Sequence, residues 1–147
     1  MVQKIYITRG LPGCGKSTWI GKIRVPGDLV CSADHIHIID GVYRYDPAKT
    51  ALGHQICLRE YNAAVSGLVP FREYVFVDNT NTSIFEIAPY VQLAEAYQIP
   101  YEIIFFPCSL EVSSQRNTHK VPLGTILQMN KNLNTESLPP WWKIRLP

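Results

Sequence analysis

Short apolar runs alternate with longer helix-like stretches along the chain, and turn residues separate them. Such alternation is typical of a parallel sheet whose strands are joined by crossover helices. The apolar runs predict strands at residues 2–8, 29–32, 73–77 and 101–106. The other stretches predict helices at residues 16–24, 47–66, 83–97, 110–116 and 122–133. The pattern therefore predicts an α/β three-layer sandwich with helices on both faces of a four- or five-stranded sheet.

Local signals support two of the predicted helices. Pro47 suits the first turn of the second helix, and Gly67 suits its end. Ser83 and Glu86 have the spacing of a capping box at the start of the third helix. These signals agree with the hydrophobic pattern about where the helices begin and end.

The domain organisation is simple, because the chain shows no internal repeat and no long linker. We therefore expect one domain over residues 1–147. The tail at residues 134–147 contains the adjacent Trp141 and Trp142. They are expected either to close the core over the last strand or to flank an adenine pocket.

The composition is that of an ordinary globular chain, with 46% hydrophobic and 18% charged residues. A formal net charge of +2 is too small to indicate a nucleic-acid partner by itself. No apolar run approaches the roughly 18 residues that span a bilayer, and the chain starts directly with a predicted strand. We therefore expect a cytoplasmic protein without a membrane partner.

The cysteines are scattered, with neither a CxxC pair nor a zinc-finger spacing. Four free thiols are the simplest expectation for Cys14, Cys31, Cys57 and Cys108. Cys14 lies in a glycine-rich loop before a predicted helix, where a thiolate can be favoured. A passive small side chain is the simpler interpretation of Cys14, and a redox-sensitive one is the alternative.

The loop at residues 10–17 matches the P-loop pattern G-x-x-x-x-G-K-[ST] at every fixed position. It follows a predicted strand and precedes a predicted helix, as the motif requires. Its glycines let backbone N–H groups point at phosphates, and the helix N-terminus adds partial positive charge. Lys16 is expected to contact the β- and γ-phosphates, and Ser17 to hold Mg²⁺. The predicted nucleotide-binding residues are Gly10, Leu11, Pro12, Gly13, Cys14, Gly15, Lys16, Ser17 and Thr18.

Acidic residues follow two of the predicted strands. Asp78 ends the apolar run 75–77 in Walker B form and is the second predicted Mg²⁺ ligand, with a turn cap as the alternative. Asp34 follows the strand at 29–32, and ligands of open parallel sheets bind beyond the carboxyl ends of strands. Its carboxylate is suited to accept the proton of an attacking hydroxyl, with a helix N-cap as the alternative.

A polar, basic stretch at residues 116–122 suits a lid over the phosphates. Arg116 would then stabilise charge on the transferring phosphoryl oxygens, unless it is only a solvated helix end. A zinc site is not expected, because the histidines match no familiar zinc spacing. The histidines are His35, His37, His54 and His119.

Together these segments resemble the polynucleotide 5′-hydroxyl kinase group of P-loop kinases, from residue 5 to about residue 129. The P-loop is common to all P-loop proteins. The Asp-Asn-Thr-Asn segment at 78–81 and the Arg-Asn-x-His-x-Val-Pro segment at 116–122 are more particular to this group. The remaining matches are Ser32-Ala33-Asp34 and Tyr45-Asp46-Pro47, with His54 and Cys57.

The resemblance implies a sheet of order 2-3-1-4, with a possible fifth strand, and a short lid over ATP. It implies that Asp34 is the general base for a nucleic-acid 5′-hydroxyl and that Arg116 is the lid arginine. It places Asp78 or Asn79 on the magnesium and acceptor side. Where the group has an arginine three residues after the base, this chain has His37. The implied acceptor-side residues are His37, His54, Asn79 and Asn81.

Several functions stay open at this point. The first is an ATP- and Mg²⁺-dependent kinase of a polynucleotide 5′-hydroxyl. A kinase of a hydroxymethylated pyrimidine in DNA and a nucleotide or small-metabolite kinase are alternatives, as is an ATP-binding regulatory module without transfer activity. A groove lined by basic side chains would favour a nucleic acid. The candidates for such a groove are Arg44, Lys49, Arg59 and Arg72.

Overall fold

The computed structural model describes residues 2–69 and 73–147. Its centre is a five-stranded sheet in the order β2-β5-β1-β6-β7, in which every neighbouring pair of strands is parallel. This order confirms the expected 2-3-1-4 arrangement and adds the fifth strand at the edge beside β6. The strands are β1 (Lys4–Arg9), β2 (Leu29–Cys31), β5 (Tyr74–Val77), β6 (Tyr101–Phe105) and β7 (Ile144–Arg145).

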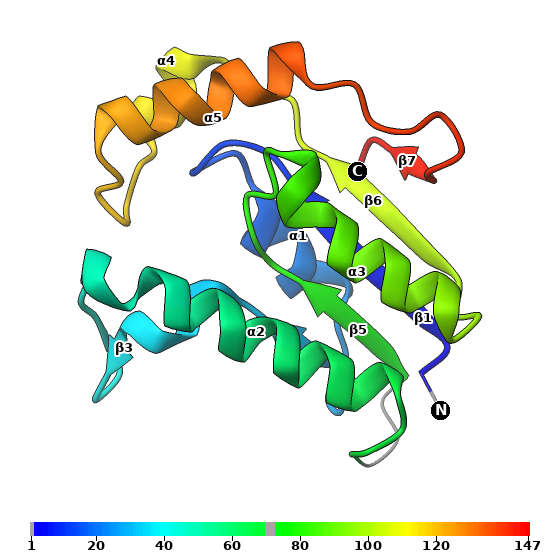
Figure 1. Ribbon diagram of the computed structural model, residues 1–147. Helices are drawn as coiled ribbons and strands as arrows, with labels where there is room; N and C mark the ends of the chain where they lie inside the picture. The colour runs from blue at the N-terminus through cyan, green and yellow to red at the C-terminus, as the bar shows by residue number, and fades with distance from the viewer. Residues whose placement is uncertain (1, 70–72) are drawn as a thin grey trace.

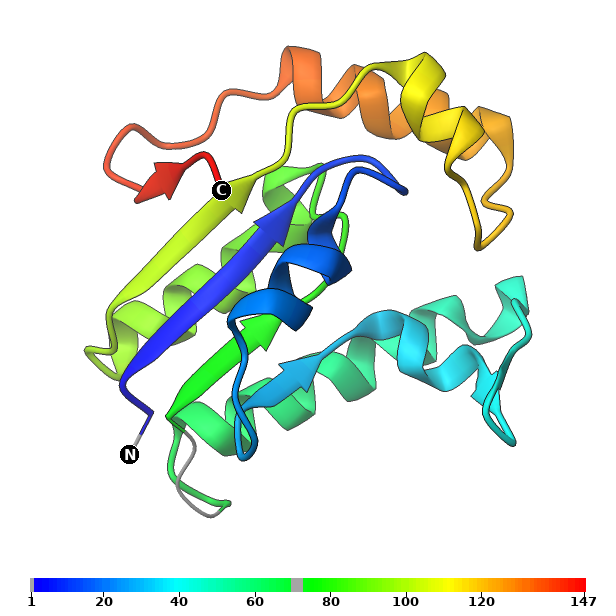
Figure 2. The same cartoon turned by 180° about the vertical axis from the view of Figure 1, so that it is seen from behind.

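Helices cover both faces of the sheet, as predicted. Helices α2 (Thr50–Val65) and α3 (Ile84–Ala96) lie on one face, and α1 (Lys16–Ile23) lies on the other (Figures 1 and 2). Helices α4 (Leu110–Gln115) and α5 (Leu123–Thr135) lie together beyond the carboxyl ends of the strands. The P-loop opens at this same end, so the fold gathers its polar loops there.

The side chains of the sheet divide between two packing layers. On the α2 and α3 face, the hydroxyl of buried Tyr61 donates to the carbonyl of Tyr90 at 2.6 Å, so the only polar group of that ring is satisfied inside the core. On the α1 face, Tyr6 stacks on Phe76 and meets the edge of Trp19. Trp19 therefore packs against the aromatic side chains on this face of the sheet.

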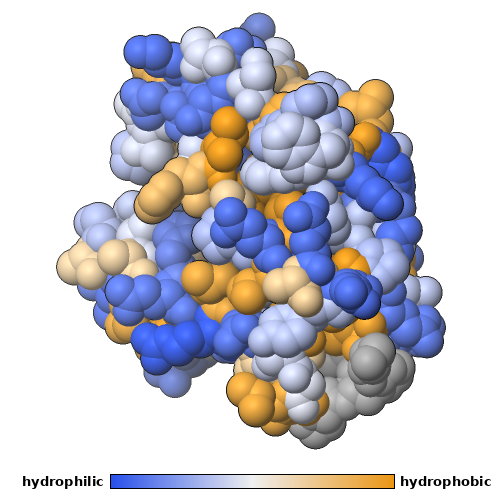
Figure 3. Space-filling view, turned by 45° about the vertical axis from the view of Figure 1, so that its right-hand side comes forward, coloured by the Kyte–Doolittle hydropathy of each residue, from blue (hydrophilic) through white to orange (hydrophobic). Residues whose placement is uncertain are grey.

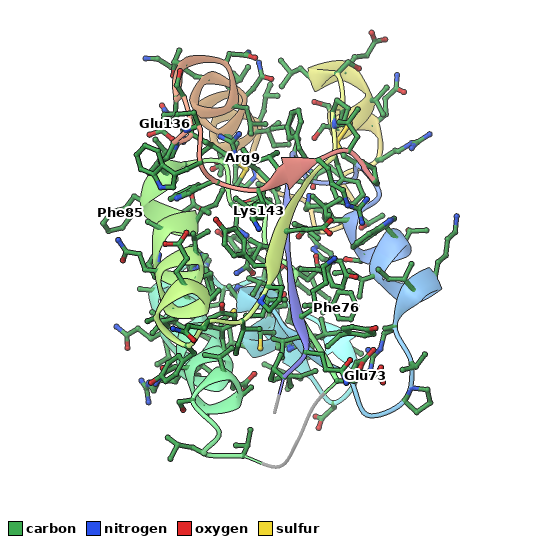
Figure 4. All side chains as sticks on the ribbon, turned by 90° about the vertical axis from the view of Figure 1, so that its right-hand side faces the viewer. Arg9, Glu73, Phe76, Phe85, Glu136 and Lys143 are labelled. Atoms are coloured by element: carbon green, nitrogen blue, oxygen red, sulfur yellow. A yellow bond between two sulfur atoms is a disulfide. The ribbon has the colours of Figure 1, made fainter. Side chains whose placement is uncertain are left out.

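Some large apolar side chains lie on the surface and not in the core. Phe85 lies on the outer side of α3 and is 89% exposed (Figure 4). In the space-filling view the hydrophobic patches are separated by larger polar areas (Figure 3). Among the described helices, none is long and apolar enough to cross a membrane. Of the two tail tryptophans, Trp142 packs against the core and Trp141 is 71% exposed.

The model corrects one expectation about the thiols. Cys14 of the P-loop forms a disulfide with Cys108, which lies between β6 and α4, with a Cα–Cα distance of 5.7 Å. Cys31 and Cys57 are free and buried. The two bonded residues are 94 positions apart, so no local spacing signals their pairing.

A second difference lies between β2 and α2, where the sequence pattern had predicted no element. A 3₁₀ turn, η1 (Ala33–His37), leads into a two-stranded antiparallel hairpin of β3 (Ile38–Ile39) and β4 (Val42–Tyr43). A second 3₁₀ turn, η2 (Pro47–Lys49), then replaces the predicted first turn of α2.

The hairpin has a clear local cause. Asp40 and Gly41 both have positive φ angles, of 52° and 77°. Asp-Gly between apolar pairs is a strong signal for a two-residue hairpin turn with left-handed backbone. The signal was therefore in the sequence, although the strands are too short for the hydrophobic pattern to reveal.

Candidate active site

The P-loop runs from the end of β1 into α1, and α4 packs against its outer side. Gly13 has φ 74°, and a Cβ there would lie 2.7 Å from the backbone oxygen of Arg116. Ser113 of α4 donates a 2.6 Å hydrogen bond to the carbonyl of Pro12. Gly15, the N-cap of α1, has φ 96°. The glycines thus allow both the close approach of α4 and the turn into α1.

Lys16 is buried, with 7% of its surface exposed. Its ammonium group donates to the carbonyl oxygens of Gly10 at 2.9 Å and Leu11 at 2.6 Å. Burial lowers the pKa of Lys16 to about 8, while the negative charges of Asp78 and Asp34 act in the opposite direction. The negative charges of both candidate carboxylates, Asp78 and Asp34, therefore act on the amine of Lys16.

Ser17 and Asp78 meet across the carboxyl end of the sheet. The hydroxyl of Ser17 donates to the Oδ2 atom of Asp78 at 2.7 Å. Mg²⁺ prefers oxygen ligands and keeps water and phosphate oxygens alongside one or two protein groups. The hydroxyl of Ser17 and the carboxylate of Asp78 match this coordination preference of Mg²⁺. No cluster of three or more His, Cys, Asp or Glu residues suited to a metal occurs among the described residues.

Asp34 lies in η1, directly beyond β2. The hydroxyl oxygen of Ser32 accepts from the backbone N–H of Asp34 at 3.2 Å, so Ser32 is the cap of this turn. The side-chain oxygen of Asn79 accepts from the backbone N–H of Ala33 at 2.9 Å. The carboxylate of Asp34 is 51% exposed. The backbone around Asp34 is therefore held, while its carboxylate faces outward.

The two asparagines expected on the acceptor side have other roles in the structure. Asn79 is buried, and its amide nitrogen lies 3.5 Å from the Sγ atom of Cys57. Asn81 is 1% exposed and donates to the carbonyl of Thr8 at 2.8 Å. The side chain of Asn79 thus joins the segment after β5 to η1 and α2, and the side chain of Asn81 joins it to β1. A polar residue type after a strand cannot by itself distinguish these two roles.

Arg9 was not anticipated as part of this framework. Its buried guanidinium donates to the carbonyl oxygens of Asn81 at 3.1 Å and Thr82 at 3.0 Å. Burial lowers the pKa of Arg9, and Glu136 opposes this with its negative charge. Figure 4 shows Arg9 near Glu136 where the tail approaches the top of the sheet. Arg9 thus fixes the segment after β5, which carries Asp78.

The two histidines expected on the acceptor side differ in their positions. His37 is 2% exposed, and its Nδ1 atom accepts from the backbone N–H of Asp46 at 3.3 Å. Its ring packs against Tyr43 and Tyr45. His37 therefore supports the hairpin from inside, and its expected substrate contact stays a prediction. His54 is exposed on α2, at the end of that helix nearer to η1.

The loop predicted to be a lid connects α4 to α5. Arg116 ends α4, is exposed and touches the P-loop at Gly13. Asn117 closes the loop on itself, donating to the carbonyl of Val121 at 2.7 Å and accepting from its N–H at 3.0 Å. The Nδ1 atom of His119 lies 3.5 Å from Oδ2 of Asp34. The loop therefore reaches from the P-loop to the candidate base.

Of the four basic residues predicted to line a groove, three lie among the described residues. Arg44 is exposed directly after β4, and Lys49 lies in η2 before α2. Arg59 instead lines a hollow between α2 and α3, with Leu58 and Leu93. Arg72 lies outside the described residues. Arg44 and Lys49 therefore share the segment between η1 and α2, whereas Arg59 lies on α2 itself.

Three comparisons place these features among known proteins. The model of the AAA domain family matches residues 5–132. Human NEDD4-binding protein 2 is 28% identical over 133 residues, which is 85% of this chain but 7% of that protein. The chain thus spans only a small part of this curated relative.

Two solved structures show the same fold. A chain of the Pnkp1/Rnl/Hen1 RNA repair complex superposes with a TM-score of 0.69 at 20% identity, over 90% of this chain and 44% of that chain. The APS kinase CysC of Mycobacterium tuberculosis, solved with AMPPNP and APS, gives a TM-score of 0.58 at 15% identity, over 99% of this chain and 88% of that one. With the P-loop in place at the carboxyl end of the sheet, the protein has the P-loop kinase fold and belongs to the AAA domain family.

Proposed function

We propose that the protein is a kinase that moves the γ-phosphoryl group of Mg²⁺-bound ATP to a hydroxyl of a nucleic acid, with a polynucleotide 5′-hydroxyl as the first choice. One observation carries the proposal: the buried amine of Lys16, the hydrogen-bonded pair Ser17 and Asp78, and Asp34 all follow strands at the carboxyl end of one sheet. A phosphate-binding amine, a metal-side carboxylate and an exposed carboxylate therefore converge at one end of the sheet.

The proposed roles follow from the charges that develop during transfer. Asp34 accepts the proton of the attacking hydroxyl as its oxygen bonds to the γ-phosphorus and the bond to the ADP oxygen breaks. Lys16 exchanges its two carbonyl partners for phosphate oxygens. Arg116, at the edge of the P-loop, stabilises the spreading negative charge. Ser17 and Asp78 would hold Mg²⁺, which neutralises the phosphates when it is bound.

The choice of a nucleic acid rests on two supports. The segments at 78–81 and 116–122 resemble those of polynucleotide kinases, and the RNA repair complex provides a matching fold. Arg44 is exposed and Lys49 is half-buried in the segment between η1, which carries Asp34, and α2, and their positive charge would favour a phosphate backbone there. The similarity to APS kinase favours a small metabolite as the second candidate acceptor.

An acceptor screen tests the proposal. Radiolabelled ATP with Mg²⁺ is offered with oligonucleotides that carry a 5′-hydroxyl, only a 3′-hydroxyl or a hydroxymethylated pyrimidine, and with nucleosides and sugars. We expect label on the 5′-hydroxyl oligonucleotide and about 10²–10³-fold less in the Lys16→Ala variant. Label only on a small metabolite would replace the nucleic-acid acceptor, and tight ATP binding without transfer to any acceptor would favour a regulatory module.

A further inference from the structure

The hairpin and the lid meet through two stacked rings next to Asp34. Tyr43 ends β4, and His119 lies in the loop between α4 and α5. Their ring centroids are 4.1 Å apart, and the ring planes differ by 13°. The two rings are therefore stacked face to face, in the geometry that a nucleobase adopts on an aromatic side chain.

Contacts with a buried histidine support the ring of Tyr43. His37 packs edge-on against it at 5.7 Å and also contacts Tyr45 at 5.0 Å. Burial raises the pKa of Tyr43 to about 12, and the negative charge of Asp34 acts in the same direction. One face of the ring is thus held close to the candidate base, and the hydroxyl stays protonated.

The partner on the other face is easily exchanged. The side chain of His119 is 46% exposed, and the same ring lies 3.5 Å from the carboxylate of Asp34. Asn117 and Val121 bond to each other across the loop, so the hydrogen bonds of this turn do not depend on the stack. A single movement of the loop would uncover both the face of Tyr43 and the carboxylate.

We propose that the ring of Tyr43 is the stacking platform for the base of the acceptor's terminal nucleotide, and that this base takes the place of the His119 imidazole. The inference rests on the proposed function, because it requires a nucleoside hydroxyl at Asp34. A 5′-hydroxyl and its own base are joined through one ribose, so a hydroxyl at Asp34 brings the base to the neighbouring ring. Every base has a π-face, so the platform accepts any sequence.

The test compares two acceptors that differ only in the terminal base. One oligonucleotide carries a 5′-terminal adenosine, and the other carries an abasic residue with the same 5′-hydroxyl. For the adenosine oligonucleotide, Tyr43→Leu should raise the KM about 5-fold to 100-fold, as expected for loss of one base stack. For the abasic oligonucleotide the KM should change by less than about 2-fold. An equal change of KM for both oligonucleotides in Tyr43→Leu would contradict the proposal that Tyr43 stacks on the terminal base.

Matched variants separate stacking from structure. Tyr43→Phe keeps the ring and should keep the preference for adenosine over abasic ends, even if turnover changes through Asp34. Tyr45→Leu removes a nearby tyrosine and should leave the ratio of the two KM values unchanged. Loss of that ratio in Tyr45→Leu, with a normal melting temperature, would contradict the assignment to Tyr43.

His119→Ala tests the displacement itself. Without its own ring on the platform, the protein should bind the adenosine oligonucleotide with a lower KM. A KM that rises as much as in Tyr43→Leu would show that His119 binds the base, which overturns the exchange. If the wild-type protein labels no oligonucleotide, the proposed function fails. If it labels both oligonucleotides with one KM, the function stands and the platform fails.

Discussion

At the scale of single residues, the candidate site contains two kinds of side chain. Some are buried and fix the backbone, and others are exposed where a substrate would bind. Asn79 binds the backbone beside Asp34 and is itself buried, whereas the carboxylate of Asp34 is half exposed. Lys16 is buried, and its amine donates to two carbonyl oxygens of the P-loop. Chemistry is thus left to a few side chains whose surroundings are rigid.

Asp34→Asn should lower kcat about 10²–10⁴-fold, because the amide cannot accept the hydroxyl proton, and leave the Kd for ATP unchanged. Steady-state kinetics and calorimetry give the two quantities. Asp40→Asn is the control, since asparagine suits the left-handed backbone that Asp40 adopts in the hairpin turn. An unchanged kcat in Asp34→Asn would remove this carboxylate from the mechanism.

At the scale of elements, α2 sets the position of η1. A Cβ added to Gly53 would lie 2.4 Å from the backbone oxygen of Ala33 and 2.9 Å from a methyl group of Ile36. The helix therefore approaches the turn as closely as glycine permits. Because Ala33 precedes Asp34, this packing also positions the candidate base.

Gly53→Ala should lower the free energy of unfolding by about 1–3 kcal/mol, because the methyl group forces α2 and η1 apart. It should also lower kcat through displacement of Asp34. Gly124→Ala in α5 is the matched control: its Cβ would meet no atom within 4 Å, so we expect stabilisation of about 0.5–1 kcal/mol. Urea denaturation measures both. A Gly53→Ala protein as stable as the wild type would refute the close packing.

A second element-scale contact is the disulfide between the P-loop and the segment before α4. Reduction should lower the free energy of unfolding by about 4–5 kcal/mol, because it releases a loop closed over 94 positions. Thermal unfolding with and without reductant measures the change. The Cys14→Ser/Cys108→Ser double variant should not respond to reductant. Titration of the unfolded, unreduced protein should find two thiols, and finding four would exclude the bond.

At the scale of the whole molecule, polar groups gather at the carboxyl end of one sheet. They come from β1, β5, α4 and the hairpin. Under the proposed function, the N–H groups of the P-loop, the Ser17–Asp78 pair and Asp34 would share a single ligand. A ligand that bridges several elements stabilises the folded state as a unit.

ATP with Mg²⁺ at about 100 times its Kd should raise the free energy of unfolding by about 2.7 kcal/mol, or Tm by about 5–10 °C for a chain of this size. ATP with a chelator should give a smaller shift. In the Ser17→Ala variant, the Tm shift with ATP and Mg²⁺ should be closer to the Tm shift with ATP and chelator, since the hydroxyl that would hold Mg²⁺ is lost. An equal shift with and without chelator in the wild type would contradict the magnesium role of Ser17 and Asp78.

Much of this architecture was predictable because its signals are local. The P-loop lies within residues 10–17, and the strand order follows from alternation and from the resemblance to P-loop kinases. The hairpin was missed although Asp40 and Gly41 signal its turn, because its strands have two residues each. The buried roles of Asn79 and Asn81 could not be read from residue type, since exposed and buried asparagines look alike in a sequence.

By itself, then, the sequence determined a phosphate cradle, its adjoining helix and the α/β layers, because backbone amides and hydrophobic periodicity act over short spans of chain. Only the tertiary structure decided that Cys14 bonds to Cys108 and that Tyr43 and His119 stack beside Asp34. These contacts join segments far apart in the chain, and packing of the whole sheet and its helices is what brings them together.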